Sequence, residues 1–270
     1  MLSYEDIGKE LGKNIFIFPL KKENIKGNTI DFTASEIAYT TDGTKPQTDS
    51  NGGIIVPAHK AVCILTNETI YITKKLGGTC HSRVGLASRG FGHIGTTLDP
   101  DYFGQLLVVL HNTTDKPQTI PKNDRIISIA LYYLNSPSHL DVDSWTNAHR
   151  DKMPPDVYND YRKWGQERQI PQDKETIKDK LLSSSEYKAF KKEYSNRLKR
   201  HSSVFSLKFF LKKNVIHGLV AIILILAYFV LDFIVFRKQD NPWSLRIDYI
   251  VPAVTFFIGT FLTRLGGKDT

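Results

Sequence analysis

The residues that could do chemistry in this chain are aspartates and arginines in short polar segments. Asp99 lies in LDPDYFGQLLVVLHN, and Arg83 lies 16 residues earlier in RVGLAS. Asp31 lies in TIDFTAS, and Asp124 precedes Arg125 in KNDRIISIAL. Carboxylates can move protons and arginines can bind anions, but no nucleophile triad or metal-ligand spacing emerges from these positions. Spacing alone therefore indicates no specific reaction.

Short β-branched runs between residues 14 and 137 must position these side chains. Gly, Asn, Asp and Pro separate the runs at intervals of about 8–12 residues, which is typical of an all-β barrel or sandwich. Cys63 and Cys80 fall in this part and are expected to be buried, reduced thiols. The runs are NIFIFPL, NTIDFTA, GGIIVP, AVCILT, TIYITK, QLLVVLHN and RIISIALYYL.

Four segments, taken in order, resemble the conserved motifs of dUTPases. TIDFTAS resembles the first motif, RVGLAS the second, LDPDYFG with the strand after it the third, and KNDRIISIAL the fourth. The opening residues 2–32 are similar to the N-terminus of dCTP deaminases. The resemblance covers residues 1–137 and points to the dUTPase/dCTP deaminase superfamily. It implies a mainly β fold, the distorted β-barrel or jelly roll of that superfamily.

The resemblance also implies roles for five residues. Asp99 would orient and activate a water that attacks the α-phosphorus of dUTP or a related deoxynucleotide, with Mg²⁺ on the phosphates. Tyr102 would pack against the deoxyribose, and Arg83 would lie near the phosphates between subunits. Gly85 and Asp31 complete the expected substrate-binding residues, and no residue is expected to bind metal directly. Because superfamily members are mostly homotrimers, a homotrimer is expected.

Four of these residues also have a structural alternative. Asp99 could be a turn residue and Tyr102 ordinary packing. Arg83 could form an ion pair at a subunit interface, and Asp31 could accept hydrogen bonds at a strand end.

The sequence also departs from the family pattern. Val84 replaces the phosphate-contacting serine of the second motif, and Ser128 replaces the glutamine of the fourth. The Gly-rich C-terminal arm that closes over the phosphates has no counterpart. Val109 stands where dCTP deaminases have their catalytic glutamate, so deamination is disfavoured.

Two apolar segments near the C-terminus predict a transmembrane hairpin. Val215 to Phe236 is 22 residues long with only His217 and Asp232 ionisable, enough to span a bilayer. Residues 249–265 form a shorter second span, with a re-entrant or interfacial helix as the alternative. The heavier positive charge precedes the first span, so both termini and the soluble domain are expected in the cytoplasm.

A charged, helical connector joins the two parts. Between Ser144 and Lys213 there are 17 lysines and arginines against 9 acidic residues, which favours an anionic membrane surface over nucleic acid as a partner. The connector is expected to pack on the barrel or on itself. We therefore predict a dUTPase/dCTP deaminase-like domain at 1–140, the connector at 141–213 and the membrane hairpin at 214–270. An amphipathic stripe is expected at Leu181, Leu182, Tyr187, Phe190 and Tyr194.

Three functions remain open from the sequence. The first is a membrane-anchored enzyme that cleaves a deoxynucleotide to its monophosphate and pyrophosphate. The second is a catalytically degenerate sensor of a nucleotide or phage protein, with the hairpin as a membrane effector in antiviral defence. The third, nucleic-acid binding by the basic connector, is the least favoured.

Overall fold

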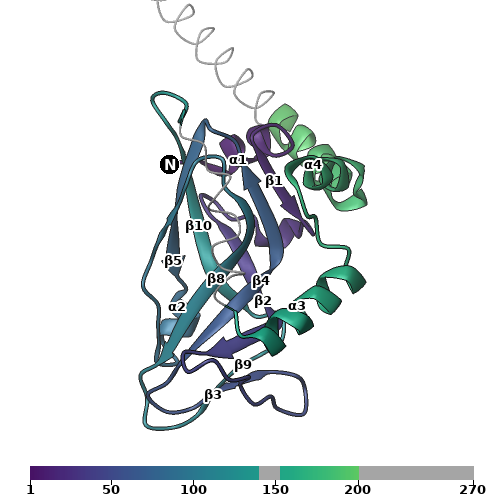
Figure 1. The fold of residues 1–270 in the computed structure, drawn as a ribbon. Coiled ribbons are helices and arrows are strands. Elements are labelled where there is room, and N and C mark those ends of the chain that lie inside the picture. The colour runs from purple at the N-terminus through teal and green to yellow at the C-terminus, as the bar shows by residue number, and fades with distance from the viewer. Residues whose placement is uncertain (140–152, 201–270) are drawn as a thin grey trace, which may run out of the picture. The chain divides into compact units, whose positions relative to one another are not determined.

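Alternating and fully apolar runs form a mainly antiparallel sheet in the computed structural model, which describes residues 1–139 and 153–200 (Figure 1). Eight strands form one sheet in the order β6-β8-β4-β2-β10-β5-β7, with β1 paired to β4, and β3 pairs separately with β9. The prediction of a mainly β fold is confirmed. The strands are β1 (Ile15–Phe18), β2 (Ile30–Thr40), β3 (Ile54–Val56), β4 (Ala61–Ile72), β5 (Leu76–Ser82), β6 (Phe91–Gly92), β7 (Thr97–Leu98), β8 (Phe103–Asn112), β9 (Gln118–Ile120) and β10 (Arg125–Tyr133).

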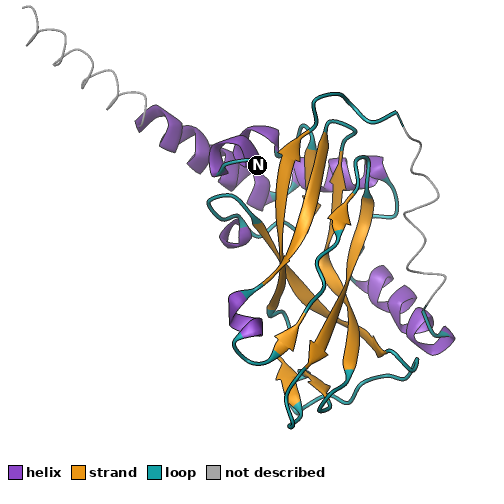
Figure 2. Cartoon of the chain, turned by 90° about the vertical axis from the view of Figure 1, so that its left-hand side faces the viewer, coloured by secondary structure: helices purple, strands orange, loops and turns teal. Residues whose placement is uncertain are grey.

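The sheet curls because its long strands change partner along their length (Figure 2). Residues 30–33 of β2 pair with β10, whereas residues 34–40 pair with β4. The register of β2 against β4 shifts between Ala34 and Ala38, and that of β4 against β8 shifts between Leu65 and Thr69. Such bulges bend a strand and increase its twist, so a single sheet can wrap around its own core.

Polar side chains buried inside the sheet fix the bulge of β4. The Glu68 carboxylate accepts hydrogen bonds from the Thr33 backbone N–H and hydroxyl, each at 2.8 Å. Asn67 donates through Nδ2 to the Ala34 carbonyl at 2.7 Å. Thr66 accepts from the Leu106 N–H at 3.0 Å. These bonds satisfy backbone groups that the bulge removes from the ladder.

Stability should depend on pH through Glu68, which is 2% exposed. Burial raises the pKa of its carboxyl above 4.5, against the opposing effect of the Thr33 donors. Because the folded state holds this proton more tightly, the free energy of unfolding is greatest below the unfolded pKa. The free energy of unfolding then falls as the pH rises through the pKa of Glu68 in the folded state. Denaturant unfolding across this range should show the fall in wild type and its loss in Glu68→Gln.

The control for this pH dependence is Glu23→Gln, since Glu23 is exposed on the surface. Its unfolding free energy should follow the wild-type curve at each pH. A Glu68→Gln curve parallel to wild type would show that Glu68 does not change its protonation on unfolding.

The N-terminal helix and the last described helix share the main hydrophobic core. Helix α1 (Tyr4–Glu10) begins with a capping box, in which the Ser3 hydroxyl accepts from the Asp6 N–H at 3.1 Å. Its Ile7 is fully buried in the same cluster as Phe190, which is 1% exposed, and the Tyr4 ring lies 6.1 Å from the Phe190 ring. Phe190 belongs to the helix of residues 185–200. The first and last segments of this unit therefore complete one core.

A second apolar cluster attaches α3 (Pro155–Glu167) to the outer face of the sheet. Val157, Tyr161 and Trp164 of α3 pack with Tyr39 of β2 and Cys63 of β4. Helix α4 (Lys174–Ser183) inserts Ile177 and Leu181, both fully buried, into the main core. The remaining described helical turns are η1 (Lys22–Asn24) and α2 (Val84–Ala87).

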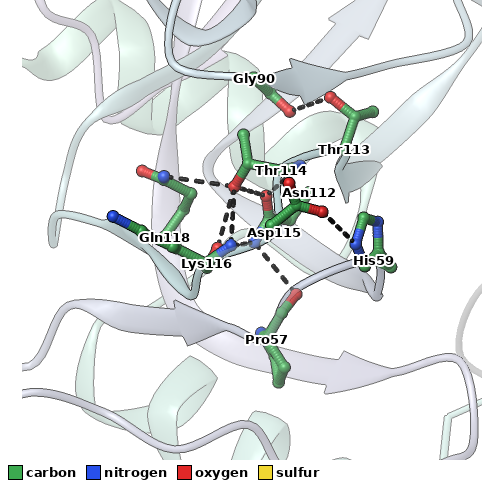
Figure 3. Close-up of polar contacts among 9 residues, drawn as sticks. All are labelled: Pro57, His59, Gly90, Asn112, Thr113, Thr114, Asp115, Lys116 and Gln118. Atoms are coloured by element: carbon green, nitrogen blue, oxygen red, sulfur yellow. Dashed lines mark hydrogen bonds and ion pairs between the residues drawn. The ribbon is translucent and has the colours of Figure 1, made fainter.

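The turn between β8 and β9 is organised by one buried amide (Figure 3). Asn112 is 1% exposed, and its Nδ2 donates to the carbonyls of Val56, Pro57 and Lys116 at 3.0, 3.1 and 2.8 Å. Its Oδ1 accepts from the N–H and hydroxyl of Thr114. The side chain thus ties the end of β8 to the loop after β3.

The described helices pack on the strands, one of the two arrangements expected for the connector. Residues 1–198 form one unit. The predicted boundaries at 140 and 213 fall outside the described residues, as do the apolar segments 215–236 and 249–265. Within residues 1–139 and 153–200, every helix is too short or too polar to span a bilayer. Cys63 and Cys80 are free and buried, as expected.

One residue of the predicted apolar stripe is exposed. Leu181 and Phe190 are buried and Tyr187 and Tyr194 pack against the core, but Leu182 is 42% exposed. Adjacent positions on a helix point about 100° apart, so Leu181 and Leu182 cannot both face the sheet.

Candidate functional site

Asp99 lies in a four-residue turn between two strands. This segment, residues 99–102 and here called the Asp99 turn, follows β7 and precedes β8. The Tyr102 N–H donates to the Asp99 carbonyl at 3.2 Å. The Thr97 hydroxyl reaches the half-buried Asp99 carboxylate only at 3.4 Å. Both flanking strands are paired, β7 with β5 and β8 with β4, so the turn is fixed at each end.

Tyr102 is oriented by the start of β8. Its hydroxyl donates to the Gln105 carbonyl at 2.7 Å, and its ring packs against the main core. Gly104, with φ of 148°, lies beneath this ring, and a Cβ there would approach the Tyr102 hydroxyl to 3.5 Å. That separation is an ordinary van der Waals contact, so it is the positive φ that favours glycine at 104.

Asp101, the third residue of the turn, is paired with a neighbouring helix. It is 7% exposed with a left-handed φ of 65°. Its carboxylate accepts from the Tyr71 hydroxyl at 3.3 Å and meets Lys174 Nζ at 2.9 Å. Burial, with the Asp101 charge as a further cause, raises the pKa of Tyr71 to about 12. Tyr71 therefore stays protonated and can donate to Asp101.

Asp31, Arg83 and Ser128 come together at the other end of β5. Asp31 on β2 lies opposite Ser128 on β10, and the Ser128 hydroxyl donates to Asp31 at 2.6 Å. Arg83 forms an ion pair with Asp31, which is 2% exposed, and Arg125 Nη1 lies 3.5 Å from the same carboxylate. The side chains of Arg83 and Arg125 are 26% and 39% exposed, so both arginines still reach solvent.

The segment after Arg83 forms the short helix α2, which a second arginine fastens to the sheet. Arg89 pairs with Asp124 at 2.8 Å and donates to the Gly85 carbonyl at 3.2 Å. Gly85 has open space around it, since no described atom lies within 4 Å of where its Cβ would be. Val84 beside it is 84% exposed. Packing within the described chain thus explains neither glycine at 85 nor valine at 84.

The two groups of predicted residues are well separated in one chain. Gly78 of β5 pairs with Leu98, so Asp99 lies beside Gly77, and Arg83 lies six positions further along. At about 3.3 Å per strand residue, this puts roughly 20 Å between Asp99 and Arg83. Asp99 and Tyr102 therefore form one group, and Asp31, Arg83 and Gly85 form another.

Three residues of these groups were not expected from the sequence as parts of a site. In the sequence, Ser128 is only a departure from the family pattern, and neither Arg89 nor Lys174 lies in a motif. Arg89 and Lys174 lie 35 and 73 positions from their aspartate partners. No local motif marks a contact over such a separation.

Residues 50–151 match the family model for dUTPase. A dCTP deaminase of Thermococcus gammatolerans is 27% identical over 129 residues, which cover 48% of this chain and 82% of that protein. These sequence matches support a dUTPase/dCTP deaminase superfamily domain in the strand-rich part of this chain. A putative deoxyuridine 5′-triphosphate nucleotidohydrolase of Frog virus 3 is 33% identical over 98 residues, 36% of this chain and 60% of that protein.

Similarity to solved structures is lower. A 2′-deoxycytidine 5′-triphosphate deaminase from Agrobacterium tumefaciens aligns with a TM-score of 0.42 and 10% identity, covering 50% of this chain and 48% of that chain. The superfamily assignment therefore rests on the sequence matches.

The superfamily domain has one apolar position of particular interest. Val109 stands where the resemblance places a deaminase glutamate, and it packs against the cluster beneath α3. A carboxylate there would lie against this apolar cluster. This packing is compatible with the expectation that deamination is disfavoured.

Proposed function

We propose that this domain binds a deoxynucleoside triphosphate and cleaves it to the monophosphate and pyrophosphate. The observation that carries the proposal is the Asp99 turn, which presents a half-buried carboxylate and an oriented tyrosine from a rigid strand pair. Asp99 would accept a proton from the attacking water, and the Tyr102 ring would pack against the deoxyribose. Both residues lie within the segment that matches the dUTPase family model.

We further propose that the complete site forms between copies in a homotrimer. Arg83 lies roughly 20 Å along the sheet from Asp99, too far for one chain to hold both ends of a triphosphate against both groups. A neighbouring copy would bring its Arg83 and Gly85 to the Asp99 turn. Val84 and Ile94, 84% and 78% exposed, are apolar residues that such a contact would cover.

The phosphates are proposed to carry a magnesium ion, which spreads the negative charge that develops on them. Across residues 1–139 and 153–200, no three His, Cys, Asp or Glu side chains lie close enough to hold a metal. Arg83 and Arg125, each held by Asp31 yet reaching solvent, supply positive charge beside the phosphates. Those arginines would orient the triphosphate, and Asp99 would direct the water.

The segments 215–236 and 249–265 are proposed to anchor the domain to a membrane, with the domain on the cytoplasmic side. Their length and apolar composition support this, together with the basic residues before the first of them. Nucleotides would reach the domain there.

A second function is proposed because the phosphate contacts are incomplete. Val84 replaces a hydrogen-bonding serine, and a Gly-rich closing arm has no counterpart. A domain that binds a nucleotide but turns it over poorly could act as a sensor, with the apolar hairpin as its effector in antiviral defence. This alternative rests on an architectural analogy.

The deciding experiment measures binding and pyrophosphate release by the full-length chain over a panel of deoxy- and ribonucleoside triphosphates with magnesium. Release from a deoxypyrimidine triphosphate supports the enzyme. Calorimetric binding without release supports the sensor. Absence of binding to every nucleotide of the panel contradicts both.

A further inference from the structure

Asp101 connects the proposed catalytic turn to the part of the chain that follows the strands. Its side chain is 10% exposed and forms an ion pair with Lys174 Nζ at 2.9 Å, while Tyr71 donates to the other carboxylate oxygen at 3.3 Å. Asp101 is also one of the few non-glycine residues in the described chain with a left-handed backbone. A left-handed aspartate is unfavourable unless its surroundings hold it.

Lys174 comes from a helix that is itself firmly seated. It is the first residue of α4, directly after Asp173, whose side chain accepts from the Thr176 N–H at 2.7 Å. Ile177 and Leu181 on the next turns are fully buried in the main core. Helix α4 lies beside β1 (Figure 1). This packing fixes the position from which the Lys174 side chain reaches Asp101.

The aromatic ring of Tyr71 completes this junction. Lys174 Nζ lies 5.6 Å from the ring centre, within the range of a cation–π contact. Tyr71 belongs to β4 and pairs with Phe103, the first residue of β8. One end of the Asp99 turn is therefore held by the sheet, and its middle is held by α4.

We propose that Lys174 is a positioning residue: through its ion pair with Asp101, α4 holds the Asp99 turn in the conformation that binds the nucleotide. Removing the ammonium would leave a nearly buried carboxylate without its cation, which favours opening of the turn. Lys174 lies outside residues 50–151, the segment that matches the dUTPase model. The positioning of the turn therefore depends on the helices that follow this segment. The effect on nucleotides rests on the proposed function, whereas the effect on the turn does not.

The test compares Lys174→Met with Lys178→Met in the full-length chain. Lys178 is a matched control, because it lies on the same helix with its Nζ also 5.6 Å from the Tyr71 ring, but it pairs with Glu175 instead. Amide hydrogen exchange at Asp101, Tyr102 and Phe103 should be about tenfold faster in Lys174→Met and unchanged in Lys178→Met. Lys174→Arg should restore slow exchange, since it keeps the charge.

The same variants should separate in nucleotide binding. The dissociation constant of the best deoxynucleotide of the panel should rise about tenfold in Lys174→Met only. In an Asp101→Asn background, Lys174→Met should cause much less further change in exchange or affinity than it does in the wild-type chain, because the ion pair is already lost. The Asp101→Asn chain also provides the test if Lys174→Met does not fold.

The outcomes distinguish the two proposals. Unchanged exchange in Lys174→Met, or equal acceleration in Lys178→Met, overturns the positioning role. If exchange is faster in Lys174→Met but the wild-type chain binds no nucleotide, the positioning role is supported and the proposed function is contradicted.

Discussion

Asp99→Asn should reduce pyrophosphate release by about 10²- to 10⁴-fold, the usual contribution of a positioned general base. The amide keeps the size of the side chain but cannot accept the proton of the attacking water. Nucleotide affinity should change little, because Tyr102 and the arginines are untouched. Pyrophosphate release and calorimetry on the full-length chain would measure the two effects separately.

The matched control for this loss is Asp115→Asn. Asp115 is also a turn aspartate, but its side chain is 95% exposed and pairs with His59, and it follows the opposite end of β8 from the Asp99 turn. It should keep wild-type turnover. Turnover by Asp99→Asn at the wild-type rate would remove Asp99 from the mechanism, and a selective loss of affinity would make it a binding residue.

Asp31→Asn should lower the free energy of unfolding by about 2 kcal/mol, the scale of a buried hydrogen bond to a charged group. Asp31 holds Arg83 and Arg125 and accepts from Ser128 at 2.6 Å. The loss should be less than for a fully buried pair, since both arginines reach solvent. Asp31 holds Arg83, which is proposed to contact the phosphates. Nucleotide affinity should therefore fall together with the free energy of unfolding.

Urea unfolding at neutral pH would measure this change, with Asp179→Asn as the control. Asp179 is exposed on α4, so its amide should leave the unfolding midpoint unchanged. Equal stability of Asp31→Asn and wild type would show that the arginines, not the carboxylate, determine the geometry of this cluster.

The sequence predicted the strands best where apolar runs were uninterrupted. Residues 61–66 and 69–74 were predicted as two runs, but β4 is one strand from Ala61 to Ile72. The polar residues Asn67 and Glu68 resemble a turn, yet their side chains bond to β2 across the bulge. Strand β5 was missed because LGGTCHS has little strand propensity, and pairing with β10 imposes its conformation.

The site was predictable in its residue types but not in its grouping. The motifs identified Asp31, Arg83 and Asp99, and only the register of β5 against β7 shows that Asp99 lies apart from the other two. Lys174 carried no motif at all. Its contact with Asp101 depends on how α4 docks on the sheet, and no local pattern encodes this docking.

The pairing of the first helix with the last has a consequence for how the protein is made. Tyr194 donates to the Glu5 carbonyl at 2.9 Å, and Lys191 donates to that of Gly8 at 2.7 Å. A nascent chain exposes Ile7 and Leu11 at the ribosome long before residues 187–194 exist to cover them. This unit can therefore finish folding only after nearly all of it has been synthesised, so its first helix is the segment a chaperone would shield longest.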